Sequence, residues 1–320
     1  MTEQWNVLLP STIDPSGPES IAEFAVCTGM DEFDSREKAL DDIGRYDAII
    51  VRLATIDADV IDRADRLQVI AKHGAGLDNV DIDAASKREI VVCNTPDVNA
   101  QSVAEHAIAL LFGVRRNLHT ADRNVRSGRW DRSVYTGQEL AGDTLGLFGF
   151  GNVARKTADL ANGIGMSVLA YDPYLPDEAF PAAVERVEST DSLFERSDAV
   201  SIHVPLTEQT HRSVSTGELT ALGEDGVLIN TARGEIVEET ALLEALDSGD
   251  LAGAGLDTFE SEPPGDDHPL YDRDEVLLTP HIGGVTEQAL ARMSRQAAAN
   301  VRTVYEGGIP ESTVNRGQIR

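Results

Sequence analysis

The stretch Thr144-Leu-Gly-Leu-Phe-Gly-Phe-Gly-Asn-Val-Ala154 decides the fold of this chain. Its first half is apolar enough for a buried strand, a glycine turn follows, and a helix is expected to begin near Asn152. The pattern is G-x-G-x-x-A, in which Gly149 permits the tight turn, Gly151 lets a phosphate approach the backbone, and Ala154 allows close helix packing. The start of such a helix presents unpaired N–H groups and the positive end of its dipole. The stretch therefore predicts a βαβ unit that binds a dinucleotide through Gly149, Gly151, Asn152 and Val153.

An acidic residue in the expected place strengthens this prediction. Asp172 lies at the end of the next expected strand, 167–171, at the spacing of about 20 residues from the glycines that the pattern requires. There a carboxylate accepts hydrogen bonds from the ribose hydroxyls and repels a 2′-phosphate. A tight turn without a ligand would explain the glycines alone but not Asp172. The expected cofactor is NAD rather than NADP.

Short apolar runs alternate with helical stretches on both sides of this unit, which indicates parallel sheets covered on both faces. The expected strands are 6–9, 48–51, 69–71 and 90–93, and then 144–148, 167–171, 199–204, 227–231, 253–257 and 276–279. They form two groups, whereas a barrel would show eight βα units in one even series. The fold class is therefore α/β, with two doubly wound, Rossmann-like domains of parallel sheet and a cleft between them.

Two long helices mark the expected domain boundaries. Ser102 and Glu105 have the spacing of a capping box, which predicts a helix that starts there and ends near residues 127–128. A second helix is expected over residues 287–306. The first domain is then discontinuous, with residues 1–100 and 286–320 binding the substrate, and residues 101–285 form the NAD-binding domain.

The charge of the chain excludes several classes of partner. Its 320 residues include 27 Lys and Arg against 55 Asp and Glu, a formal net charge of −28. Such a surface disfavours nucleic acid and anionic membranes, which both attract cationic proteins. Only four of the cations are lysines, and excess carboxylate with scarce lysine is typical of a surface that works in high salt. The alternative is an ordinary acidic cytoplasmic protein, since the pI is near 4.4.

Other features that the sequence lacks exclude further classes of protein. Cys27 and Cys93 are the only cysteines, which excludes a disulfide-rich scaffold and a cysteine-rich metal site, and no metal is expected. The first residues, Met1–Trp5, lack a basic segment followed by an apolar one, so no secretory signal is expected. No run approaches the ~20 apolar residues of a membrane span. We therefore expect a soluble cytoplasmic protein.

Three later segments end expected strands, at the edge where open α/β sheets bind ligands. They are Asn230–Gly234, Leu256–Pro263 and Thr279–Gly284. Arg233 offers a planar fork for a carboxylate. His281 can supply a proton, and Glu262 nearby would raise its pKa. Each of these residues alone has an ordinary structural explanation, but together they suit the reduction of a 2-oxo acid.

With these motifs in this order, the chain resembles the D-isomer-specific 2-hydroxyacid dehydrogenases over essentially its whole length. The matching segments are the 149–154 fingerprint with Asp172, Arg126–Trp130, His203–Leu206, Asn230–Gly234, Asp257–Pro263 and Thr279–Gly284. The resemblance implies Arg233 for substrate binding and carbonyl polarisation, His281 as general acid and base, and Glu262 as its partner. It also implies a homodimer that uses the helix from Ser102.

The resemblance further implies the residues that contact the cofactor and substrate. Asp257 would hold the nicotinamide carboxamide. The other residues expected to line the cofactor are Val204, Pro205, Thr231, Ala232, Arg233, His281, Gly283 and Gly284. The backbone amides of Ala75 and Gly76 would bind the substrate carboxylate, although Gly74 and Gly76 would also suit a plain βα turn. Arg233 and His281 would complete the substrate site.

Arg52 and Asn99 match positions that contact the phosphate or carboxylate end of the substrate in phosphoglycerate dehydrogenases, and an arginine at a strand end suits phosphate. The expected reaction is therefore the interconversion of 3-phosphoglycerate and 3-phosphohydroxypyruvate, a step of serine biosynthesis. Two features depart from that pattern: Arg52 has no basic residue directly after it, and His73 replaces a small residue. The chain ends at Arg320, so the C-terminal regulatory domains of longer relatives are not expected.

Two other functions remain open at this point. One is a hydroxypyruvate or glyoxylate reductase, or a broad 2-oxoacid reductase, of the same family. The other is a nucleotide-sensing protein resembling the corepressors of this superfamily, for which the chain offers no partner motif. A formate dehydrogenase fits poorly, because that reaction delivers no proton to a carbonyl and has no use for Glu262 with His281.

Overall fold

The computed structural model describes residues 4–319 and divides into two compact units. The first unit comprises Met1–Asn99 and Val285–Arg320, and the second comprises Ala100–Gly284. Each boundary lies one residue from the domain boundary that the sequence predicts. Residues 1–3, on which the expected absence of a secretory signal partly rests, and residue 320 lie outside the described residues.

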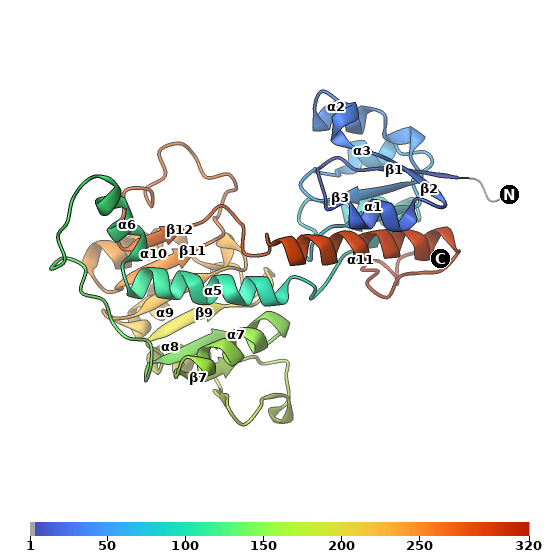
Figure 1. Cartoon of the computed structure of the whole chain (residues 1–320). Coiled ribbons are helices and arrows are strands. Elements are labelled where there is room, and N and C mark those ends of the chain that lie inside the picture. The colour runs from blue at the N-terminus through green and yellow to red at the C-terminus, as the bar shows by residue number, and fades with distance from the viewer. Residues whose placement is uncertain (1–3, 320) are drawn as a thin grey trace. The chain divides into compact units, whose positions relative to one another are not determined.

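The first unit is a parallel five-stranded sheet with helices on both faces (Figure 1). Its strands are ordered β2-β1-β3-β4-β5, so the strand order reverses next to β1. The strands are β1 (Trp5–Leu8), β2 (Ala25–Thr28), β3 (Ala48–Val51), β4 (Val69–Lys72) and β5 (Val91–Cys93). The helices are α1 (Ser16–Ile21), α2 (Arg36–Asp41), α3 (Ala58–Asp62), α4 (Ile82–Lys87) and α11 (Glu287–Tyr305). This order places a ligand crevice at the carboxyl ends of β1 and β3.

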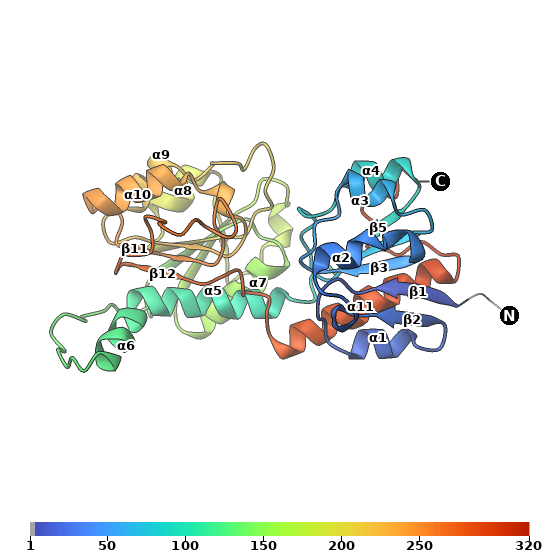
Figure 2. The ribbon, with the colours of Figure 1, turned by 90° about the horizontal axis from the view of Figure 1, so that it is seen from above.

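The second unit is a parallel seven-stranded sheet, ordered β12-β11-β10-β9-β6-β7-β8 (Figure 2). Its strands are β6 (Thr144–Phe148), β7 (Ser167–Tyr171), β8 (Glu185–Arg186), β9 (Ala199–Ile202), β10 (Val227–Asn230), β11 (Gly253–Leu256) and β12 (Val276–Leu278). Its helices are α5 (Ala100–Arg115), α6 (Leu118–Arg126), α7 (Asn152–Gly163), α8 (Thr190–Glu195), α9 (Thr216–Leu222) and α10 (Glu239–Ser248). The order reverses between β6 and β9, which is the dinucleotide-binding topology.

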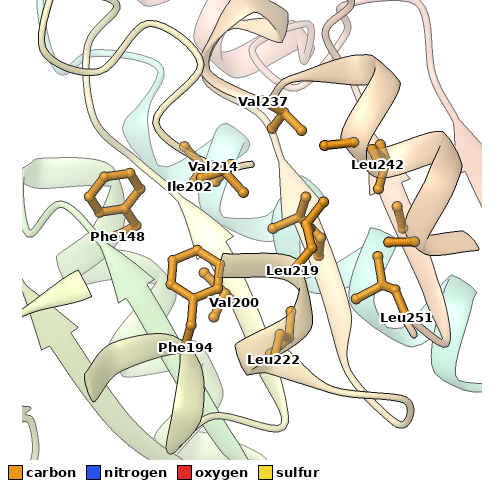
Figure 3. Packing of buried hydrophobic residues seen from close by; sticks show 14 of the residues in the cluster. Phe148, Phe194, Val200, Ile202, Val214, Leu219, Leu222, Val237, Leu242 and Leu251 are labelled. Carbon is orange, nitrogen blue, oxygen red and sulfur yellow. The ribbon is translucent and has the colours of Figure 1, made fainter. Parts of the chain in front are cut away.

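Two hydrophobic clusters cover the two faces of this sheet, as a doubly wound fold requires. On one face, helices α8, α9 and α10 contribute Phe194, Leu219 and Leu242, which pack with Val200 and Ile202 of β9 (Figure 3). On the other face, α5 and α7 pack through leucine and alanine side chains. The continuously buried strands explain why their sequences read as apolar runs without alternation.

The sequence-based helix prediction is wrong in two details. Helix α5 begins at Ala100, so Ser102 lies inside its first turn and is buried, and Glu105 accepts a hydrogen bond from Gln101 instead of closing a capping box. The expected single helix to residues 127–128 is two helices, because Asn117 adopts φ 51° and starts α6 afresh. A local capping pattern predicted a helix here but not its first residue.

No helix among residues 4–319 combines the length and the apolar character that crossing a membrane requires.

Candidate active site

The glycine turn after β6 has the geometry of a phosphate-binding loop. Gly149 has φ 93°, and a Cβ there would lie 2.9 Å from the backbone of His203. Gly151 is the N-cap of α7, and a Cβ there would meet no atom within 4 Å, so its backbone faces open space. Asn152 and Val153 form the first turn of α7, whose leading N–H groups have no partner within the helix. Ala154 is fully buried against the sheet, as the pattern requires.

Asp172 is fixed beside this loop by two backbone N–H groups. Its Oδ2 accepts from Phe150 N at 3.0 Å and its Oδ1 from Tyr174 N at 3.0 Å. The carboxylate therefore stands at the carboxyl end of β7, next to the loop. This is the position in which a carboxylate contacts the adenosine ribose.

The neighbouring strands β9, β10 and β11 are each followed by a buried polar side-chain atom. Within residues 4–319, His203 Nε2, Thr231 Oγ1 and Thr258 Oγ1 are buried and make no hydrogen bond. Burial lowers the pKa of His203 to about 3, so its ring is neutral and Nε2 is free to exchange one hydrogen bond with a ligand. Because unpaired buried polar groups are costly, this edge of the sheet suits a polar ligand that would pair with them.

The loop after β9 borders the glycine turn. Val204 packs close to Gly149, since a Cβ on that glycine would lie 2.9 Å from Val204 Cγ1. Pro205 O accepts a hydrogen bond from Thr210 Oγ1 at 2.6 Å, which closes the loop on itself. Val204 therefore lies beside the glycine turn and Pro205 follows it, and their contacts with the cofactor stay a prediction.

Arg233 is held by a short loop that Asn230 organises. Asn230 is buried, its side chain donates to Arg233 O at 2.8 Å and accepts from Ala232 N at 3.0 Å. Gly234 then lets this loop touch the next one, because a Cβ there would lie 1.9 Å from the carbonyl carbon of Phe259. The arginine is thereby set against the loop that carries Glu262.

Glu262 and His281 form a direct pair. His281 Nδ1 lies 2.6 Å from Glu262 Oε2, and Glu262 Oε1 accepts from Phe259 N at 3.1 Å. The His281 side chain is about half exposed, at 49%, so its other ring nitrogen can reach a ligand. The two residues come from different loops, after β12 and β11, and the tertiary structure brings them together.

Neighbouring charges and hydrogen bonds shift the pKa of both members of this pair. Contact with Glu262 raises the pKa of His281, and Asp257 adds to the effect, while burial and Arg233 oppose it. Burial pushes the pKa of Glu262 upward, but the bonds from His281 and Phe259 and the charge of Arg233 outweigh it and lower that pKa. The contact with Glu262 therefore favours the imidazolium form of His281 beside a carboxylate.

Asp257 has a different environment from the one the sequence suggests. It is 1% exposed, and its oxygens accept from Thr279 Oγ1 at 2.6 Å, Ile282 N at 2.8 Å and Gly283 N at 2.7 Å. Burial raises the pKa of Asp257, but these bonds and one from His106 outweigh it, so its pKa is lowered. Gly283 is buried beside it and Gly284 follows at the end of the second unit. The contact of Asp257 with the nicotinamide carboxamide stays a prediction.

The residues predicted for the substrate lie in the first unit, at the carboxyl ends of its strands. Arg52 follows β3, Ala75 and Gly76 follow β4, and Asn99 follows β5. The loop after β4 is fixed by Gly74 N donating to Thr95 Oγ1 at 2.9 Å, and by Asn94 Nδ2 donating to Ala75 O at 2.8 Å.

Two residues that contact the predicted site residues, Lys72 and His106, were not predicted from the sequence. Lys72 Nζ donates to Arg52 O at 2.9 Å, so a second cation lies beside Arg52 although none follows it in sequence. His106 of α5 approaches Asp257 and Thr279. Lys72 could have been found from its place at the end of β4, next to β3. His106 carries no signal except its spacing along an apolar helix face.

Comparisons with known proteins agree with this geometry. Residues 108–283 match the family model of the D-isomer specific 2-hydroxyacid dehydrogenase, NAD binding domain. D-3-phosphoglycerate dehydrogenase of Methanocaldococcus jannaschii is 37% identical over 94% of this chain, which spans 57% of the length of that enzyme. Hydroxypyruvate reductase of Thermotoga maritima is 41% identical over 78% of this chain and 82% of its own. A crystal structure of a Thermus thermophilus protein has a TM-score of 0.87 and 34% identity, covering 97% of this chain and 99% of that one.

Proposed function

Because this chain belongs to the D-isomer-specific 2-hydroxyacid dehydrogenase family, we propose that it is an NAD-dependent enzyme that interconverts a D-2-hydroxy acid and its 2-oxo acid. The observation that carries this proposal is the pair of His281 and Glu262, 2.6 Å apart, at the strand ends of the dinucleotide-binding unit. Such a pair is useful for moving a proton to or from an oxygen, which is the half of the reaction that protein side chains must perform.

The roles of the protein groups follow from their charges. Bound NADH supplies the hydride that reduces C2 of the oxo acid. His281 donates the proton that converts the carbonyl oxygen into a hydroxyl, and Glu262 stabilises the imidazolium before that transfer. Arg233 binds the substrate carboxylate and polarises the carbonyl group. In the oxidative direction, neutral His281 accepts the hydroxyl proton.

The expected cofactor is NAD rather than NADP. Asp172 is anchored by Phe150 N and Tyr174 N beside the phosphate loop, so it cannot swing away to accommodate a 2′-phosphate without losing both bonds. A fixed carboxylate repels that phosphate and accepts hydrogen bonds from the ribose hydroxyls. Gly149, Gly151, Asn152 and Val153 would bind the pyrophosphate. The remaining proposed cofactor contacts are Val204, Pro205, Thr231, Ala232, Arg233, Asp257, His281, Gly283 and Gly284.

Among substrates, we place 3-phosphoglycerate and 3-phosphohydroxypyruvate first, which would assign the enzyme to serine biosynthesis. The support is the charge at the strand ends of the first unit, where Lys72 contacts the backbone of Arg52. Burial lowers the pKa of His73, and the charges of Arg52 and Lys72 lower it further. Burial also lowers the pKa of Arg52, and the charge of Arg36 adds to that effect, so positive charges repel one another in this region. A dianionic phosphate would relieve this repulsion. Ala75 and Gly76 would bind the carboxylate, with Asn99 at the same strand edge.

A hydroxypyruvate or glyoxylate reductase is the second candidate, favoured by the 41% identity to the Thermotoga maritima enzyme. A panel of 3-phosphohydroxypyruvate, hydroxypyruvate, glyoxylate and branched 2-oxo acids, with NADH in molar KCl, distinguishes the two. Highest kcat/KM on the phosphorylated compound supports the first substrate. Turnover only of unphosphorylated acids rejects it, and NADH binding without any turnover would favour the nucleotide-sensing alternative.

We also propose that the enzyme is a cytoplasmic homodimer with a surface suited to high salt. Helix α6 and the segment after it extend away from the sheet of the second unit (Figure 2). They expose Leu118, Val125, Trp130 and Val134, each more than half accessible. Exposed apolar side chains gathered on one segment indicate a protein contact. Light scattering with Trp130→Ser should show a shift of mass from dimer to monomer.

A further inference from the structure

Helix α5 contacts strand β11 at positions that repeat regularly along both elements. A Cβ on Gly253 would lie 2.9 Å from Val114 Cγ1, and one on Gly255 would lie 2.9 Å from Leu110 Cβ. Four helical residues rise about 6 Å and two strand residues about 6.6 Å, so the contacts repeat along both elements. The next step of this register pairs His106 with Asp257. The two glycines thus let α5 approach closely enough for His106 to reach the carboxylate.

His106 joins a cluster whose members occupy nearly all the hydrogen-bonding capacity of Asp257. His106 Nε2 lies 2.9 Å from Thr279 Oγ1 and 3.3 Å from Asp257 Oδ1. Thr279 gives its single hydroxyl hydrogen to Asp257, so its oxygen accepts from His106. A carboxylate has about four acceptor sites, and Asp257 receives hydrogen bonds from Thr279 Oγ1, Ile282 N and Gly283 N. Asp257 is only 1% exposed, so these contacts are shielded from water.

The same cluster fixes the loop that carries His281. Ile282 and Gly283 directly follow His281 and bind the two oxygens of Asp257. His281 N donates to Asp257 O at 2.8 Å and to Thr279 O at 3.1 Å. His281 itself has φ 51°, a left-handed conformation that is uncommon among residues other than glycine. The loop is therefore held on both sides of the imidazole.

We propose that His106, Thr279 and Asp257 form a loop clamp that positions His281 against Glu262. The inference rests on the proposed function, in which His281 is the proton donor. These three are positioning residues. Loss of the Thr279 hydroxyl or of the His106 imidazole should therefore change the geometry and pKa of His281, with little effect on NADH binding.

Thr279→Val tests the clamp without altering any charge. Valine keeps the shape of threonine but removes the hydroxyl that links His106 to Asp257, whereas the control Thr279→Ser keeps it. We expect Thr279→Val to lower kcat by about 10- to 100-fold, because a displacement near 1 Å is enough for such a loss. The KM for NADH should change less than about threefold. His106→Leu and His106→Gln form a second pair, in which glutamine retains a donor.

The pH profile separates positioning from simple structural support. Glu262 and Asp257 raise the pKa of His281, while Arg233 and burial lower it. Once the loop loosens and His281 leaves Glu262, its pKa falls, so the alkaline limit of reductive activity moves to lower pH. Thr279→Ser should keep the wild-type profile. Melting temperatures of all variants establish that each is folded at the assay temperature.

Imidazole titration by NMR tests the clamp without turnover. The signal of His281 is assigned by its loss in His281→Asn, and its pKa is compared in wild type, Thr279→Val and Thr279→Ser. A downward shift in the valine variant alone supports the clamp even if none of the oxo acids is a substrate, in which case only the proposed function fails. Identical titrations and kcat values in both variants, or a raised KM for NADH as the only change, would overturn it.

Discussion

His281 is held with φ 51° on a loop that follows a strand, and contact with Glu262 raises its pKa. We expect His281→Asn to reduce oxo-acid turnover by about 100- to 10,000-fold, the usual contribution of a general acid. Asparagine is the most informative substitution, because it tolerates this left-handed conformation and so preserves the loop while removing the imidazole. NADH binding, measured by fluorescence titration, should remain. Undiminished turnover would refute the role of His281 as proton donor.

Glu262 raises the pKa of His281, so it widens the pH range in which the enzyme can reduce a substrate. The reduction needs the imidazolium, which is present below the pKa of His281 and lost above it. Glu262→Gln removes the negative partner, and the pKa of His281 falls toward its ordinary value. The alkaline limit of kcat for reduction should therefore move to lower pH, while the alkaline limit is unchanged in the surface control Glu244→Gln. An unmoved limit in Glu262→Gln would contradict the pairing.

At the scale of elements, sequence patterns predicted all the central strands but only two of the four edge strands. Strands β3, β6 and β7 have the predicted bounds, and the other predicted strands differ from the structure only near their ends. The predictions missed β2 and β8, which lie at the edges of their sheets. Both are only partly buried and lack the continuous apolar run that marks a central strand, whereas the edge strands β5 and β12 have apolar sequences and were predicted.

The contact between the β10 and β11 loops depends on a single glycine. A Cβ on Gly234 would lie 1.9 Å from the carbonyl carbon of Phe259, so Gly234→Ala must push apart the loops carrying Arg233 and Glu262. We expect a loss of about 1–3 kcal/mol in unfolding free energy, typical of overpacking, together with a fall in kcat. Urea unfolding and steady-state assays measure both.

Gly217→Ala is the matched control for that substitution. Gly217 lies in α9, and a Cβ there would meet no atom within 4 Å. Alanine should stabilise the protein by about 0.4–1 kcal/mol, because it reduces the freedom of the unfolded chain, and activity should be unchanged. Equal effects of the two substitutions would contradict the proposed loop contact.

At the scale of the whole molecule, the net charge of −28 resides on the surface. Within residues 4–319, Asp47 and Asp257 are the only buried carboxylates, and Asp47 is paired with Arg66. The other acidic side chains repel one another through water. Salt weakens that repulsion, since the screening length falls from about 10 Å at 0.1 M to about 3 Å at 1 M.

We therefore expect a higher melting temperature and higher activity in molar KCl than in 0.1 M KCl. Sucrose of equal osmolality is the control, because it stabilises folded proteins without screening charge. A protein that is equally stable and active at both salt concentrations would show that the acidic surface is not an adaptation to high salt.

The sequence by itself determined the α/β class, the dinucleotide fingerprint and the identity of Arg233, Glu262 and His281 as candidates, because these depend on local patterns and on residue order. It could not determine how Glu262 meets His281, since the partners lie on separate loops that only the sheet order brings together. The environment of Asp257 is the clearest case. Its donors come from α5 and from the loop after β12, and only the packing of α5 on two glycines of β11 places His106 within reach.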